Sequence, residues 1–252
     1  MKKKLAFFIS VIFYFCFGSL LVIFHLLQWI SFYGFGYRAH LYTVEYLNLG
    51  LLVCLKILGT KISFVQIDAL PKDRPLIFVA NHQSTYDIPP MIWHLRKHHP
   101  KFISKKELGK GIPSVSFNLR HGGAVLIDRK KTKEAMDLIS DFGKKLNQKK
   151  RSAVIFPEGT RSRDGSPKKF QKSGLICLFE SMPDALIVPI SIGNSWRFGK
   201  DNYFPMPLGV HLKIMVHQAR EIDRKNPLKC IDEIEQCIGE AVRKKQNPTP
   251  SF

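Results

Sequence analysis

Residues 76–87, LIFVANHQSTYD, run from a continuous apolar stretch straight into a polar turn. The first five residues have the composition of a strand that is buried on both faces, as strands of parallel sheets are. The turn carries His82 and Asp87, five positions apart, and an Ile-Pro-Pro sequence then begins a helix. Open α/β sheets bind ligands at the carboxyl ends of their strands. We therefore expect His82 and Asp87 at the functional edge of an α/β sheet.

This spacing lets Asp87 fold back onto His82. A carboxylate that accepts a hydrogen bond from one ring nitrogen fixes the tautomer, and the other nitrogen can then take a proton from a hydroxyl. The pair alone is a weak signal. Asp87 is also well placed to cap the following helix, with His82 only filling the loop, and the spacing leaves both interpretations open.

On either side of this turn, short β-rich runs alternate with amphipathic stretches. The apolar runs predict strands at 76–80, 101–104, 124–128, 153–156, 185–192 and 210–216, and the amphipathic stretches predict helices at 88–97, 131–149, 173–181 and 227–244. The pattern is typical of a mixed, largely parallel α/β sheet covered by helices. We assign this domain to residues 61–245 and expect a flexible tail at 246–252.

The first 60 residues are strongly apolar. Residues 5–33 contain no permanently charged side chain, and about 20 apolar residues suffice to cross a hydrocarbon core. A second stretch at 41–59 is interrupted by Glu45, Asn48 and Lys56, so it is closer to an amphipathic helix. We expect a membrane-embedded helical hairpin at 1–60. A cleaved signal peptide, the alternative, has a shorter apolar core and a small-residue cleavage site that this segment lacks.

The chain is strongly basic, with 39 Lys and Arg against 20 Asp and Glu and a net charge of +19. Such a charge indicates an anionic partner: nucleic acid, an anionic membrane surface or a phosphorylated substrate. Beyond residue 60 no basic face is interleaved with aromatic residues, so we do not expect nucleic acid. A hairpin keeps the lysines at 2–4 and the basic body on one side, which predicts the inner (cytoplasmic) membrane with the active domain on its cytoplasmic face.

Three further segments lie at or in predicted strands: GAVLIDR at 123–129, FPEGTRS at 156–162 and VPI at 188–190. Together with NHQSTYD, and in this order, they resemble the glycerolipid acyltransferase family, in particular its bacterial 1-acylglycerol-3-phosphate acyltransferases. One block would be a weak match, whereas four in order are specific. The sequence departs from the family pattern at Lys172, which is followed by an additional residue before Gly174.

The resemblance implies transfer of a fatty acyl group from acyl-CoA or acyl carrier protein to the sn-2 hydroxyl of 1-acylglycerol-3-phosphate, a lysophospholipid, giving phosphatidate. No cofactor is expected besides the acyl donor. His82 is implied as the general base and Asp87 as the residue that orients it, with direct attack by the hydroxyl. A Ser84 nucleophile is the alternative, although Ser84 has no second base beside it.

The resemblance also implies a substrate-binding set: Arg129 and Arg161 for the phosphate, Glu158 for a glycerol hydroxyl, and Gly159, Thr160 and Lys172 beside them. A guanidinium fork matches phosphate oxygens better than an ammonium does. Glu158 is alternatively a structural salt-bridge partner of Arg161 or Arg163. Lys105 or Lys106 is a candidate for stabilising the oxyanion, and a plain solvated charge run is the competing interpretation.

Other functions remain open at this point. The acceptor is alternatively another lysophospholipid or lipid, or water, in which case the same His-Asp pair serves a thioesterase or lipid hydrolase. Water would need neither the two arginines nor the FPEGTR turn, and these favour a phosphorylated acceptor. No metal is expected, because the neighbouring His98 and His99 cannot converge on one ion and no carboxylate cluster accompanies them.

Overall fold

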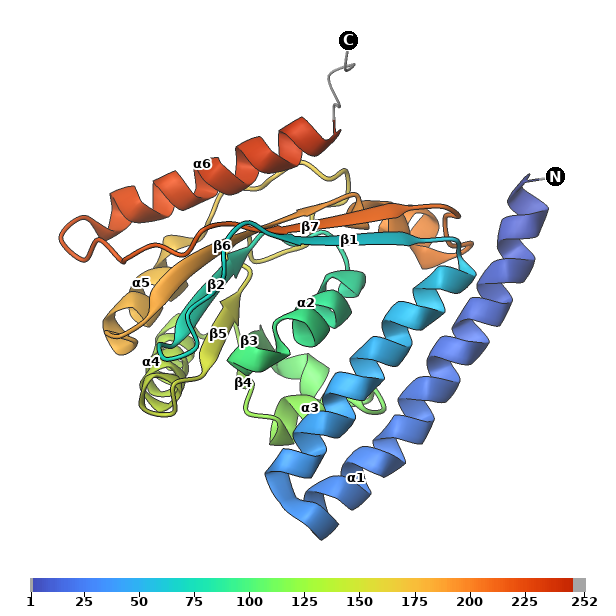
Figure 1. The fold of residues 1–252 in the computed structure, drawn as a ribbon, viewed down its shortest axis with the longest axis horizontal. Helices are drawn as coiled ribbons and strands as arrows, with labels where there is room; N and C mark the ends of the chain where they lie inside the picture. The colour runs from blue at the N-terminus through green and yellow to red at the C-terminus, as the bar shows by residue number, and fades with distance from the viewer. Residues whose placement is uncertain (1, 247–252) are drawn as a thin grey trace.

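The computed structural model describes residues 2–246 and consists of one mixed sheet, helices on both of its faces and a long helical hairpin at its side (Figure 1). The expected tail at 246–252 lies outside the described residues except for Gln246, which ends the last helix.

The sheet has seven strands in the order β1-β7-β6-β2-β5-β3-β4. Neighbouring strands are parallel except for the antiparallel pair β6 and β7, so the predicted mixed, largely parallel sheet is confirmed. The carboxyl ends of β2, β5, β3 and β4 therefore meet at one edge. The strands are β1 (Lys61–Gln66), β2 (Leu76–Ala80), β3 (Pro100–Lys105), β4 (Val125–Ile127), β5 (Ser152–Ile155), β6 (Leu186–Gly193) and β7 (His211–Val216).

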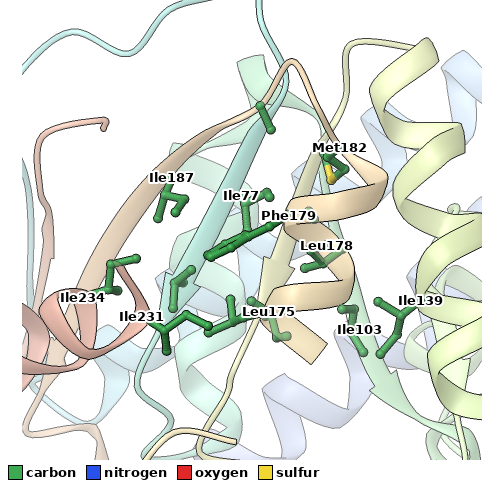
Figure 2. Close-up of a cluster of buried hydrophobic side chains, with 14 of the residues drawn as sticks. Ile77, Ile103, Ile139, Leu175, Leu178, Phe179, Met182, Ile187, Ile231 and Ile234 are labelled. Carbon is green, nitrogen blue, oxygen red and sulfur yellow. The ribbon is translucent and has the colours of Figure 1, made fainter. Parts of the chain in front are cut away.

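Three helices cover one face of the sheet, and two shorter ones lie on the other. The five are α2 (Ile88–His94), α3 (Val115–His121), α4 (Thr132–Gln148), α5 (Lys172–Ser181) and α6 (Pro227–Gln246). On the first face, α4, α5 and α6 bury a cluster that includes Ile139, Phe179 and Ile231 against Ile77 of β2 (Figure 2). The alternate residues of β2, such as Phe78, pack with α2 on the opposite face, as the continuous apolar run predicted.

Short 3₁₀ helices complete the connections between strands. They are η1 (Thr85–Asp87), η2 (Arg96–His98), η3 (Lys106–Gly109) and η4 (Ser195–Tyr203). The first and third follow the carboxyl ends of β2 and β3, and η4 follows β6.

The N-terminal α1 (Lys2–Ile57) consists of two helical arms that reverse at Gly36, whose φ of 79° lies in the left-handed region that favours glycine (Figure 1). The arms are in contact: Thr43 Oγ1 donates to Ser31 Oγ at 3.0 Å. Farther along, a Cβ added at Gly50 would lie 3.2 Å from the Leu20 side chain. The described part of α1 is long and apolar enough to cross a membrane.

The hairpin has two different sides. Phe13 and Leu55 are fully buried against Tyr86, Phe198 and other residues of the α/β domain. In contrast, large side chains on the outer side are open: Phe8, Phe15 and Phe35 are 66%, 75% and 77% exposed. The hairpin thus docks on the domain through one apolar side and leaves another apolar side uncovered.

Candidate functional site

The polar turn after β2 holds His82 and Asp87 in contact. His82 Nδ1 and Asp87 Oδ2 lie 2.8 Å apart. The same Asp87 oxygen accepts hydrogen bonds from the backbone amides of Gln83, at 2.7 Å, and Ser84, at 3.0 Å. Three donors therefore fix the Asp87 carboxylate. Because Asp87 is fully buried, water does not compete for these hydrogen bonds.

Asp87 also has a local structural role. Ser84 is the N-cap of η1, where its Oγ accepts from the Tyr86 amide at 3.0 Å, and Asp87 closes the capping box by accepting from the Ser84 amide. Asp87 makes no side-chain capping bond to α2, the helix that the sequence suggested. Holding the turn and holding His82 are therefore compatible roles of one carboxylate.

The His82 ring is fixed on its face as well as at Nδ1. It stacks on Phe156 at the end of β5, with ring centroids 4.2 Å apart and an interplanar angle of 22°. The His82 side chain is 17% exposed, so a reactant can still reach it. With Nδ1 donating to Asp87, Nε2 is the nitrogen that can take a proton.

Ser84 is poorly placed to act as a nucleophile. Its side chain is fully buried, and its Oγ both accepts from the Tyr86 amide and lies 2.5 Å from Ser195 Oγ. A hydroxyl engaged in this way has no path to an acyl group, and the geometry favours direct attack by the acceptor.

Two side-chain amides tie the turn to β6, to the segment after it and to the loop after β5. Asn81 exchanges two hydrogen bonds with the backbone of Ile192, at 2.9 and 2.7 Å, which extends the pairing of β2 with β6. Gln83 accepts from the Trp196 amide at 3.3 Å and donates to the Gly165 carbonyl at 3.2 Å. Sequence reasoning missed both roles, and the only available signal was the position of the two amides beside His82.

The FPEGTR turn after β5 lies against the same site. The Ser162 amide donates to the His82 carbonyl at 2.8 Å, which joins the two turns directly. Gly159 has a φ of 71°, and a Cβ there would lie 3.1 Å from the Gln171 side chain. Thr160 Oγ1 accepts from Lys168 Nζ at 3.0 Å. The structure thus brings Gly159 and Thr160 into one tight turn next to His82.

Glu158, in this turn, is a buried carboxyl. One oxygen accepts from the Lys168 amide at 3.3 Å, whereas Oε2 has no hydrogen-bond partner among the described residues. Burial raises the pKa of Glu158 to about 7, against the lowering effect of backbone amides such as that of Lys168. Within the described part of the chain, neither Arg161 nor Arg163 forms an ion pair with it. Its second oxygen, Oε2, is itself buried, so a bound hydroxyl reaches it only if the turn opens.

Arg161 follows in the same turn and is half-buried. Its Nη1 donates to the hydroxyl of Tyr203, in η4, at 3.2 Å. The guanidinium is therefore held by a neutral partner, and its positive charge is not neutralised by that contact.

The other predicted residues lie farther along the edge. Lys105 ends β3 and Lys106 begins η3, and both are exposed. Arg129, also exposed, follows β4, which is three strands from β2, or roughly 14 Å at the usual strand spacing. Lys172 begins α5 beside the FPEGTR turn, since the Gln171 amide donates to the Pro157 carbonyl at 2.8 Å. The Lys172 side chain points away from the turn, because its Nζ forms an ion pair with Asp232 of α6 at 2.5 Å.

The chain is similar to known proteins over this region. A family model described as Acyltransferase matches residues 61–193, a little over half of the chain. The 1-acyl-sn-glycerol-3-phosphate acyltransferase of Helicobacter pylori is 39% identical over 127 residues, which cover 47% of this chain and 51% of that protein. The protein of the same name from Saccharomyces cerevisiae is 36% identical over 138 residues, 55% of this chain and 40% of its own. The chain thus spans about half the length of the curated relatives it matches.

A solved structure has the same fold over its whole length. The crystal structure of the 1-acyl-sn-glycerophosphate acyltransferase PlsC from Thermotoga maritima superimposes with a TM-score of 0.78 and covers 100% of both chains at 23% sequence identity.

Proposed function

Since this chain belongs to the acyltransferase family, we propose that it transfers a fatty acyl group from acyl-CoA or acyl carrier protein to the sn-2 hydroxyl of 1-acylglycerol-3-phosphate, giving phosphatidate. The observation that carries the proposal is the His82–Asp87 pair, fixed at 2.8 Å and joined through the Ser162 amide to a turn that carries Arg161. The names of the relatives, 1-acyl-sn-glycerol-3-phosphate acyltransferases from bacteria to yeast, support the choice of acceptor.

In the proposed reaction, His82 Nε2 takes the proton of the acceptor hydroxyl while the oxygen of that hydroxyl attacks the carbonyl carbon of the thioester. The tetrahedral intermediate then collapses, the carbon–sulfur bond breaks and the departing thiolate receives the proton from His82. Asp87 keeps the proton of the resting ring on Nδ1 and stabilises the imidazolium that forms. A general base of this kind contributes roughly 10²–10⁴-fold to the rate.

The acceptor is held, in this proposal, by the FPEGTR turn. Arg161 binds the phosphate through charge-assisted hydrogen bonds. Glu158 binds the glycerol hydroxyl when the turn opens, because its unpartnered Oε2 is buried in the closed turn. Gly159 and Thr160 shape the turn around them. Arg129 is the second candidate phosphate ligand, and Lys105 or Lys106, at the end of β3, is the candidate for stabilising the oxyanion.

We further propose that the hairpin lies in the inner membrane, with the active domain on its cytoplasmic face. The exposed apolar side of the hairpin supports membrane insertion, and the net charge of +19 supports contact with an anionic lipid surface. Acceptor and product are bilayer lipids, so this arrangement spares the acyl chains a passage through water.

The rival functions differ in what accepts the acyl group. Purified protein in vesicles, incubated with a radiolabelled acyl donor and a panel of lyso-lipids, should form labelled phosphatidate in preference to other products. Parallel reactions with acyl-CoA and with acyl carrier protein identify the donor. Preferred labelling of another lyso-lipid would replace the acceptor, and release of free fatty acid without lipid product would instead indicate a thioesterase or hydrolase.

A further inference from the structure

The segment from η4 to Met206 has an unusual backbone. Asp201, Asn202 and Tyr203 have φ values of 50°, 51° and 68°, so three consecutive residues other than glycine occupy the left-handed region. Side chains disfavour this conformation, and it persists only where surrounding contacts determine it.

The contacts that hold this segment come from the first arm of the hairpin. Tyr14 Oη donates to the Tyr203 carbonyl at 2.6 Å. Four residues before Tyr14, Ser10 Oγ accepts from the Met206 amide at 2.8 Å. The rings of Phe7 and Phe204 pack edge to face with centroids 5.2 Å apart. Three successive turns of the arm thus contact residues 203–206 and hold them in place.

The side chain of Tyr203 points away from the hairpin, toward Arg161. Its hydroxyl accepts the hydrogen bond from Arg161 Nη1 at 3.2 Å. One residue is therefore bonded to the hairpin through its carbonyl and to Arg161 through its phenol. We propose that Tyr203 is a positioning residue for Arg161, and that the first hairpin arm sets the position of this guanidinium through it; this inference rests on the proposed role of Arg161 in phosphate binding.

A neutral partner suits this task. Arginine has five N–H donors in a fixed fork, and a phenol occupies one of them while leaving the others for phosphate oxygens. A carboxylate in the same place would compete with the phosphate for the positive charge. Tyr203 restricts the orientation of the long Arg161 side chain before the acceptor binds, which lowers the entropy lost on binding.

The test is a double-mutant cycle on the full chain in phosphatidylcholine vesicles with saturating acyl donor. Tyr203→Phe keeps the ring and removes the hydroxyl. We expect roughly a three- to tenfold rise in the KM for lysophosphatidate, with kcat and the KM for the donor nearly unchanged. In an Arg161→Ala background the same substitution should have no further effect.

Two more variants separate positioning from general damage. Tyr14→Phe removes the bond from the hairpin to the Tyr203 carbonyl, and it should raise the same KM by a smaller factor, again only when Arg161 is present. Tyr42→Phe removes a phenol that is 60% exposed on the second arm, and it should change nothing. Thermal unfolding and vesicle sedimentation verify that each variant folds and binds vesicles. If Tyr203→Phe does not fold, the double-mutant cycle of Tyr14→Phe with Arg161→Ala tests the positioning role in its place.

The outcomes distinguish the positioning role of Tyr203 from the phosphate-binding role of Arg161. If Arg161→Ala raises the acceptor KM but neither tyrosine variant does, or if their effects persist without Arg161, the positioning role is wrong and the proposed function stands. If Arg161→Ala leaves the acceptor KM unchanged, the phosphate role of Arg161 fails and the positioning role fails with it.

Discussion

A single oxygen of Asp87 serves His82 Nδ1 and two backbone amides at once, with all three donors within 3.0 Å. The carboxylate that orients the ring is therefore part of the backbone structure of the turn. This explains how a short, polar loop keeps the His82 ring in one orientation at the edge of a sheet.

Asp87→Asn tests the charge of this group. An amide either offers N–H to Nδ1, which favours the wrong tautomer, or presents its oxygen without the charge that stabilises an imidazolium. We expect kcat to fall by roughly 10²-fold or more, with little change in the acceptor KM. Steady-state kinetics check this, with the melting temperature as control. A variant that folds normally and retains its kcat would show that orientation by Asp87 is dispensable.

Arg161→Ala tests phosphate recognition. The loss of a charge-assisted hydrogen bond worth about 1.5–3 kcal/mol should raise the KM for lysophosphatidate about tenfold or more. Arg163→Ala is the matched control, because Arg163 lies in the same segment but is exposed, and the KM of this variant should stay near that of the parent protein. Arg129→Ala should have a smaller effect than Arg161→Ala. Equal effects of Arg161 and Arg163 would point to general electrostatic attraction instead.

The raised pKa of Glu158 predicts that the stability difference between the parent protein and Glu158→Gln depends on pH. Its pKa is raised from an ordinary value of 4.5 to about 7, so the folded protein retains a proton that the unfolded chain loses between these values. Folding is therefore penalised increasingly as the pH rises from about 4.5 to 7, and the penalty is constant above that range. Glu158→Gln keeps the shape without the titration.

The stability difference between Glu158→Gln and the parent should shift in favour of the variant by on the order of 3 kcal/mol through this window and then level off. Thermal unfolding of both proteins in the same detergent, across the pH range, measures the difference. All other groups titrate alike in both proteins. A difference that does not change with pH would contradict the raised pKa.

The fold was predictable where burial imposes a pattern. The apolar run of β2 and the helical spacing of Ile231, Ile234 and Ile238 in α6 both match buried faces of the structure. Strand β1 was missed because it lies at the edge of the sheet and buries none of its side chains fully. Helix α3, with only seven residues, is too short to show a clear period.

The site was predictable only as far as local sequence carries it. The turns with His82 and Glu158 follow strands, and their place at one edge follows from a parallel sheet. Tyr203 was not predictable, since its two bonds reach residues 189 and 42 positions away and its own segment has no periodic pattern. Lys172 was expected near the substrate from the resemblance alone, whereas the start of α5 directs it toward Asp232.

The uncovered side of the hairpin predicts how the protein binds membranes. Replacing Phe8 and Phe15 together by Glu should strongly reduce sedimentation with vesicles of phosphatidylcholine and phosphatidylglycerol, because two exposed apolar side chains that insert into the bilayer in this proposal become charged. The control is Leu228→Glu, because Leu228 is 53% exposed and belongs to α6, a helix that lies across the sheet from the hairpin (Figure 1). Equal binding by both variants would mean that charge alone attaches the protein.

The role of His82 as general base is tested by the rate of labelled phosphatidate formation by His82→Ala, compared with the unchanged protein at saturating donor and lysophosphatidate. We expect a loss of roughly 10²–10⁴-fold, with the melting temperature and vesicle binding nearly unchanged, because His82 lies in a partly exposed turn and not in the core. Turnover near that of the unchanged protein would contradict the assignment of His82 as the general base.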